Sequence, residues 1–431
     1  MTTAAAGALA CAGVMTAVPA SAADMLSLGV GGYMEQWVGY ANRDDMGADG
    51  GFGVQSDSEI HFRGSLESDS GLKFTVHVEL EANNEDQMGD NTEIDESFVR
   101  ASGDFGTLEI GQRDPIHTRT HYAAAFGAGV GLNAGDTQKW IPGSYLETAG
   151  WTIPGDDLGV IYITPRVNGV QVGLSYHPDS TNENAPTRAP ANNDDSVIAA
   201  GVNFNHTVGD MAIKVSLGHV NVSNPGMVSY NRYNNDTTNA AVTAVADDDM
   251  MMGFSDKTFT NAGLSVGMGA FTFSASYATR DDGGYMPECW NVANRGAANE
   301  AKMLVACGDL PMDLSHTEAN EATGTYPGVD SDASGTVDGT EVVTDVIAVE
   351  DKSGQHDTFA VGISYSDGPM SVSIGHMVRD REDGKERSAT MVSAGYKLAP
   401  GVDWKTSIFS VDDTGAGTEG TAFVTGLDLA F

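Results

Sequence analysis

The sequence predicts an all-β fold, a transmembrane antiparallel β-barrel of 16 strands, and three observations predict it. Segments of about ten residues alternate apolar with polar or small residues, as tilted membrane strands do. The connections between these segments alternate between short and long. The chain also ends in mid-strand on Phe431, which suits a barrel because its last strand closes against its first and leaves no edge.

The amino terminus predicts a signal peptide over residues 1–22. An apolar run there ends in Ala20-Ser21-Ala22, an A-x-A cleavage site, so the mature chain is expected to begin at Ala23. No Lys or Arg precedes the run, which leaves open a start codon further upstream. Residues 23–431 then form the barrel.

The clearest alternation flanks a short turn at Ser68–Gly71. Before the turn, Ile60, Phe62 and Leu66 share one face of the segment and polar residues share the other. After it, alternate positions from Leu72 onward are apolar and those between them are polar or charged. The predicted strands are centred near residues 33, 61, 77, 98, 110, 162, 173, 202, 215, 264, 274, 361, 374, 393, 406 and 426.

The connections between predicted strands sort by length. Short turns at one end and long loops at the other indicate an asymmetric membrane barrel with periplasmic turns and outer loops. A soluble sandwich has no reason to alternate in this way. The longest outer loop is predicted over residues 281–357. The predicted turns are Ser68–Gly71, Gly103–Gly106, Arg166–Gly169, Thr207–Asp210, Gly267–Ala270, Ser366–Pro369 and Lys397–Gly401.

The acidic charge of the chain disfavours one class of partner. The chain has 60 acidic and 22 basic residues and a formal net charge of −38. This balance disfavours nucleic acid as a partner, because phosphate contacts need Lys and Arg, and none is expected. Acid gathers in the predicted outer loops, including Asp247–Asp249, which indicates a solvated surface, cation enrichment at a pore mouth, or both.

Several stretches carry a family resemblance. They are Ala23–Tyr33, Gly103–Asp114, Tyr162–Arg166, Gly173–Asp179 and the terminal Phe431. Taken in order, they resemble a general porin of Gram-negative bacteria, of the alphaproteobacterial type. The resemblance spans the mature chain apart from the longest loops.

The resemblance implies a homotrimer in the outer membrane, in contact with its lipid and lipopolysaccharide. It implies a water-filled channel for small hydrophilic solutes and ions, and the acidic charge favours weak cation selectivity. The alternative is a substrate-selective channel for a sugar or an organic ion. No enzyme is expected, because the 10 histidines are scattered and no nucleophile motif accompanies them.

The resemblance also implies that the third outer loop, about residues 115–158, folds inward to form a constriction. In the family, acidic residues of this loop face basic residues on the opposite wall. Asp136 and Glu147 are the acidic candidates, and a role as solvated loop carboxylates stays open for both. Arg100 shares its parity with Phe98, so its facing is ambiguous. The basic candidates are Arg63, Lys73, Arg100, Arg113 and Arg166.

One loop motif indicates calcium. Residues 330–341 place oxygen ligands at the spacing of an EF-hand loop, with Gly335 at the sharp bend. No flanking helices are evident, so the similarity is to the loop alone, and an acidic loop that fits by chance is the alternative. The predicted ligands are Asp330, Asp332, Ser334, the Thr336 carbonyl, Asp338 and Glu341.

Two cysteines remain in the predicted mature chain. Cys289 and Cys307 lie in the same long loop, and an exported protein meets an oxidising compartment. We therefore expect a disulfide between them, with free thiols as the alternative.

Overall fold

A computed structural model gives the fold of the chain. It describes residues 26–44, 51–82, 94–124, 137–142, 146, 148–150, 155–178, 196–223, 227–230, 250–254, 256–281, 285–286, 288–291, 303–306, 355–381, 384–414 and 419–431. Within these ranges, no helix has the length and apolar character needed to cross a membrane.

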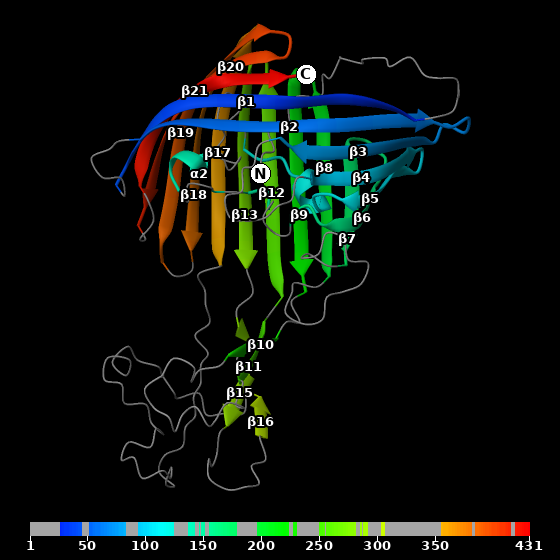
Figure 1. Ribbon diagram of the computed structural model, residues 1–431, viewed down its shortest axis with the longest axis vertical. Helices are drawn as coiled ribbons and strands as arrows, with labels where there is room; N and C mark the ends of the chain where they lie inside the picture. The colour runs from blue at the N-terminus through cyan, green and yellow to red at the C-terminus, as the bar shows by residue number, and fades with distance from the viewer. Residues whose placement is uncertain are drawn as a thin grey trace.

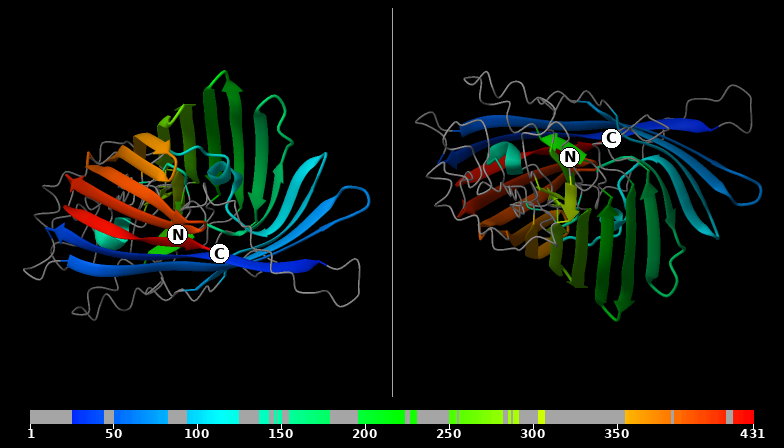
Figure 2. Two further views of the ribbon diagram at one scale, coloured as in Figure 1. Left: turned by 90° about the horizontal axis from the view of Figure 1, so that it is seen from above. Right: turned by 90° about the horizontal axis from the view of Figure 1, so that it is seen from below.

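Sixteen antiparallel strands form a closed barrel in which each strand pairs with its neighbours in the chain (Figures 1 and 2). Every predicted strand is present, so the predicted fold class is confirmed. The barrel strands are β1 (Ser27–Arg43), β2 (Gly51–Glu67), β3 (Lys73–Glu81), β4 (Ile94–Gly103), β5 (Gly106–Gln112), β6 (Leu158–Ile163), β7 (Val170–His177), β8 (Val197–Val208), β9 (Met211–Val222), β12 (Lys257–Met268), β13 (Phe271–Asp281), β17 (His356–Asp367), β18 (Met370–Arg381), β19 (Glu386–Ala399), β20 (Val402–Asp413) and β21 (Gly420–Ala430).

The last strand closes the barrel against the first. Tyr33 of β1 lies opposite Ala430 of β21. Phe431 extends this ladder, because its N–H donates to the Gly32 carbonyl at 3.1 Å and its carbonyl accepts from the Gly32 N–H at 2.9 Å. Phe431 therefore takes part in the ladder that closes the ring of strands.

Alternation along the strands separates two faces of the wall. Leu174, Ile374 and Ile408 are 55%, 51% and 49% exposed, respectively, and face outward as lipid-facing residues of a barrel do. Near the short turns, Tyr396 lies opposite Trp404 in the register of β19 and β20. Both are exposed, which suits aromatic residues at a membrane interface.

The short turns lie together at one end of the barrel. Each contains a glycine whose backbone lies in the left-handed region that residues with a Cβ rarely adopt. This explains how so many strands reverse direction within a few residues. These glycines are Gly71, Gly106, Gly169, Gly209, Gly269, Gly368 and Gly401.

The long connections contain the remaining described elements. The third loop, defined here as residues 113–157, holds two short helices, α1 (Ile116–Arg119) and α2 (Thr137–Trp140). Two small sheets lie outside the barrel order. They consist of β10 (Met227–Tyr230), β11 (Met250–Phe254) and β14 (Tyr285–Met286), and of β15 (Glu288–Asn291) and β16 (Met303–Ala306).

Candidate functional site

The third loop docks on the inner face of the barrel wall. After α1, the backbone N–H of Tyr122 donates to Ser216 Oγ at 2.8 Å, and that of Ala124 donates to Ser276 Oγ at 3.0 Å. Both serines are buried inward-facing residues of β9 and β13. The described parts of the loop, including both helices, therefore lie inside the ring of strands (Figure 2).

Glycines on the wall make room for this loop. A Cβ on Gly263 of β12 would lie 2.0 Å from the Tyr122 carbonyl oxygen. A Cβ on Gly201 of β8 would lie 2.0 Å from Thr120 Oγ1. Real Cβ atoms do not approach so closely, so the small residues on these strands allow the backbone of the loop to pack flat against the wall.

His117 of α1 lies between the loop and the wall. It is fully buried, and its ring centroid lies 5.8 Å from that of Phe259. Burial lowers the pKa of His117 to about 3, so the ring is neutral at neutral pH. His121 Nε2 lies 3.2 Å from Thr148 Oγ1 of the same loop.

The other part of the third loop covers an apolar patch on the inner wall. The Trp140 indole N–H at the end of α2 donates to Gln55 Oε1 of β2 at 2.6 Å. The inner face of β19–β21 is apolar here, whereas a lumen face is usually polar. The loop excludes water from this patch. The cluster includes Trp37, Met391, Phe409, Val411 and Val424 of the wall and Trp140, Ile141 and Leu146 of the loop.

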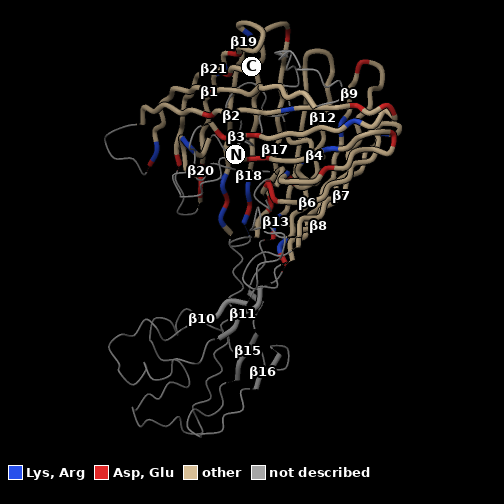
Figure 3. The backbone as a smooth tube through the Cα atoms, turned by 45° about the vertical axis from the view of Figure 1, so that its right-hand side comes forward, with Lys and Arg blue, Asp and Glu red and all other residues tan. Residues whose placement is uncertain are grey.

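The neighbouring part of the inner face, on β2–β5, is charged. Acidic and basic residues interleave on this side (Figure 3). Arg63 Nη2 lies 3.5 Å from Glu79 Oε1 of the neighbouring strand, and its side chain is 45% exposed. Arg113 forms an ion pair with Glu96. Two of the predicted basic residues therefore pair with carboxylates of the wall itself.

Phe98 lies next to two arginines of this face, and their contacts show that Arg100 faces inward. The register of β3 and β4 shifts after Val78, an irregularity of the kind that re-aims side chains. Phe98 is buried, and the guanidinium carbons of Arg100 and Arg113 lie 5.2 and 4.7 Å from its ring centroid. Arg100 and Phe98 therefore share the inner face, and the ring is a platform for two cations.

Glu109 of β5 joins the wall to the third loop. It is 1% exposed, and its Oε1 accepts from Arg100 Nε at 2.6 Å and from Arg119 Nη2 at 3.1 Å. Arg119 belongs to α1. Sequence reasoning missed both Glu109 and Arg119. The position of Glu109 opposite Arg100 in two paired strands was the available signal.

Carboxylates gather on the same wall near its long-loop end. They form two groups of three residues, and in each group one carboxylate oxygen per residue lies within 4.8 Å of those of the other two residues. Burial, with Asp114 and Asp95 nearby, raises the pKa of Asp156 well above its usual range. Burial lowers the pKa of Arg113 to about 10. The groups are Glu59, Glu81 and Asp95, and Glu96, Asp114 and Asp156.

Two predicted basic residues lie away from this cluster. Lys73 is exposed at the first position of β3, opposite Glu67. Arg166 lies at a short turn, where it donates to Gly169 O at 2.7 Å and to Asn203 Oδ1 at 2.6 Å. Lys73 therefore lies at the end of the barrel with the short turns. Arg166 starts from a short turn but reaches the third loop indirectly, because Asn203 Nδ2 donates to the Thr120 carbonyl at 3.4 Å.

The remaining predicted sites fall partly or wholly outside the described residues. Asp136 and Glu147, the calcium loop 330–341 and the signal peptide 1–22 all lie there. Cys307 does too, so the predicted disulfide with Cys289 stays a prediction.

Comparison with known proteins identifies relatives of this chain. A family model described as Gram-negative porin matches residues 4–309. Among solved structures, an anion-selective porin from Comamonas acidovorans is 14% identical with a TM-score of 0.53. Another porin is 16% identical with a TM-score of 0.52, and OmpT, an outer membrane protein of Vibrio cholerae in trimer form, is 11% identical with a TM-score of 0.51.

Each comparison covers 94% of this chain and 100% of the other chain. At such low identity, these similarities establish the fold alone. No curated protein sequence matches the chain significantly.

Proposed function

The chain belongs to the Gram-negative porin family, and we propose that it is a general diffusion porin that conducts small hydrophilic solutes and ions. Its place is the bacterial outer membrane. The observation that carries the proposal is the charged inner wall on β2–β5. Arg63, His61 and Glu79 have side chains that are 45%, 18% and 13% exposed inside the barrel, so water reaches this wall.

We infer weak cation selectivity, and the balance of charge on that wall supports the inference. Arg63 and Arg100 of β2–β5 and Arg113, directly after β5, each have a carboxylate partner. Further carboxylates surround Asp95. An excess of fixed negative charge raises the local concentration of cations. The anion-selective relative shares only the fold, so its selectivity does not carry over.

Assembly as a homotrimer is part of the proposal. It is supported by the trimer form of the Vibrio cholerae protein. The channel is passive and has no catalytic role, in keeping with a family of channels whose selectivity comes from width and field.

The test is the zero-current potential of purified protein in a planar bilayer under a salt gradient, in the presence of chelator. Wild type is expected to give large, steady, weakly cation-selective steps. In the double variant Glu81→Gln with Asp95→Asn, the zero-current potential is expected to shift in the direction of weaker cation selectivity. Asp69→Asn, in a short turn at the other end of the barrel, is the matched control and should change little.

Two outcomes would count against the proposal. Small currents blocked by one solute would indicate a substrate-selective channel instead. An unchanged potential in the double variant would show that these wall carboxylates do not set selectivity.

A further inference from the structure

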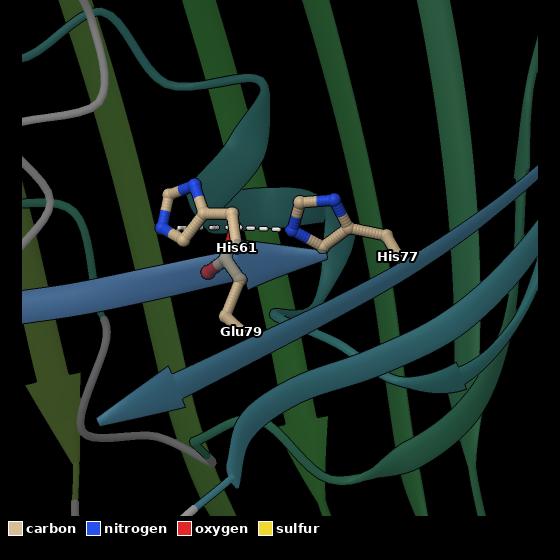
Figure 4. A group of neighbouring side chains, drawn as sticks. All are labelled: His61, His77 and Glu79. Atoms are coloured by element: carbon tan, nitrogen blue, oxygen red, sulfur yellow. Dashed lines mark hydrogen bonds and ion pairs between the residues drawn. The ribbon is translucent and has the colours of Figure 1, made fainter. Parts of the chain in front are cut away.

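Two histidines and a glutamate converge on the inner wall between β2 and β3 (Figure 4). His61 lies directly opposite Glu79, and His77 lies opposite Arg63, two positions along the same pair of strands. Because residues two apart in a strand share a face, all of these side chains point to the interior. One donor atom from each of His61, His77 and Glu79 lies within 4.8 Å of the other two.

We propose that His61, His77 and Glu79 bind a divalent transition-metal cation, with Zn²⁺ as its representative. Imidazole nitrogen with one carboxylate is a donor set that suits zinc, copper, nickel and iron. The hard cations Ca²⁺ and Mg²⁺ prefer oxygen ligands. The proposal therefore concerns an ion different from the calcium predicted for residues 330–341.

The donor distances are close to those that zinc requires. His77 Nε2 lies 2.5 Å from Glu79 Oε1, and His61 Nε2 lies 3.9 Å from the same oxygen. Ligand atoms around tetrahedral zinc lie about 3.3 Å apart when each is about 2.0–2.1 Å from the ion. The distance from His77 to Glu79 must lengthen and that from His61 to Glu79 must shorten, each by less than about 1 Å. Small changes in side-chain rotamers can supply such shifts.

Access and neighbouring groups also suit an exchangeable ion. His61 and Glu79 are partly exposed to the lumen, whereas His77 is held in place at 3% exposure. Glu59 Oε2 lies 2.8 Å from His61 Nε2 and adds a second carboxylate beside that nitrogen. The open side toward the lumen leaves room for water as a further ligand.

The positive charge of Arg63, next to His77, disfavours a bound cation. The proposal therefore predicts a specific effect of removing that charge. Arg63 Nε donates to His77 Nδ1 at 2.6 Å, so in this arrangement the His77 Nε2 proton is donated to Glu79. An ion at Nε2 requires that proton to leave, and the ring regains a proton at Nδ1 when Arg63 turns away. The Arg63 side chain is 45% exposed, so it has solvent to turn into.

The consequence for the channel rests on the proposed function. A bound dication adds positive charge to the inner wall. Micromolar Zn²⁺ is therefore expected to lower cation conductance, whereas the binding itself requires no channel activity.

The experiment measures Zn²⁺ binding to folded, detergent-solubilised protein by titration calorimetry, in excess Ca²⁺ to occupy sites made of carboxylates alone. Wild type is expected to bind one ion per chain. His61→Ala and His77→Ala should weaken binding by about tenfold to a hundredfold or more. Arg63→Gln should tighten it by about tenfold, because a nearby positive charge is removed.

His219→Ala is the matched control, because His219 is an exposed strand histidine bonded to Thr260 Oγ1. The Zn²⁺ affinity of this control variant should equal that of wild type. Absence of zinc binding, or equal binding by His61→Ala and wild type, would overturn the proposal. If His77→Ala fails to fold, the Zn²⁺ affinities of His61→Ala and Arg63→Gln still test the proposal. Zinc binding by a protein that is silent in bilayers would refute the proposed function alone.

Discussion

At the scale of single residues, the inner wall is organised by charges that neutralise one another across neighbouring strands. Phe98 lies under two guanidinium groups, and Glu109 accepts hydrogen bonds from two arginines. These contacts limit the freedom of long side chains that would otherwise sweep through the lumen. Arg63 keeps more freedom, because it is more exposed than Arg100.

Glu109→Gln is expected to destabilise the folded barrel. The change removes the charge that accepts from Arg100 and Arg119, and hydrogen bonds to charged groups contribute about 1.5–3 kcal/mol each. The measurement is the urea midpoint of unfolding followed by tryptophan fluorescence. Glu67→Gln, at the exposed end of β2, is the control, and an equal shift in both variants would contradict the prediction.

At the scale of elements, the third loop depends on a track of small inner-wall residues. Serines of β7, β9 and β13 accept from loop N–H groups, and glycines of β8 and β12 leave space for its backbone. The loop is therefore held by backbone contacts spread over many strands. Its position follows from the wall as much as from its own sequence.

Gly263→Ala is expected to push the loop away from the wall into the lumen. The new methyl carbon would lie 2.0 Å from the Tyr122 carbonyl oxygen. Single-channel recording should show lower conductance and more current noise. Gly267→Ala on the same strand is the control, because its Cβ meets only an ordinary contact at 3.6 Å from the Ala212 side chain. Identical recordings from the two variants would show that this contact does not position the loop.

Asp156 is expected to weaken loop docking as the pH rises. Its folded-state pKa lies above the ordinary value of 3.8, so the docked loop favours the protonated acid. Below the ordinary pKa, Asp156 is protonated in both the docked and the undocked loop, so it does not change the free energy of docking. Above that pKa, Asp156 ionises more readily in the undocked loop, which makes docking less favourable. Asp156→Asn should therefore stabilise the protein near about pH 8, and the gain should vanish toward about pH 4.

The measurement is the thermal unfolding midpoint of wild type and Asp156→Asn across this pH range, with chelator present. Asp104→Asn, in the exposed turn between β4 and β5, is the control. A stabilisation of Asp156→Asn that does not depend on pH would contradict the stated cause.

At the scale of the whole molecule, the barrel removes every strand edge within the closed sheet. The pairing of β1 with β21 completes the ring, so backbone groups within the membrane find partners on both sides. Outward-facing apolar residues meet lipid, while the charged wall and the third loop are enclosed. A channel protein of the outer membrane follows from this arrangement.

The predicted calcium loop gives a further whole-molecule prediction. Asp332→Asn with Glu341→Gln should reduce calcium affinity at least about tenfold, because carboxylate ligands set the affinity of such loops. Isothermal titration with Ca²⁺ measures this, with Asp247→Asn, in a different acidic run, as the control. Equal affinity in all three proteins would favour an acidic loop that fits the motif by chance.

Much of the fold is predictable from sequence because alternation is a local property. The period of two along residues 72–81, and the glycines of the short turns, act within a few residues. The count, order and direction of the strands follow from such signals. Pairing of the first strand with the last follows as well, because a barrel leaves no strand edge unpaired.

Local sequence patterns predict the barrel, the ends at which its turns and loops lie, and Arg63 and Arg113 as basic residues of the wall. The three-dimensional arrangement is needed to show which carboxylates these arginines meet, that Arg119 and Glu109 join the third loop to the wall, and that His61 and His77 converge. Those contacts join residues from different strands and a loop. Their geometry depends on register, on the shift after Val78 and on the docking of the loop, and no local pattern records any of these.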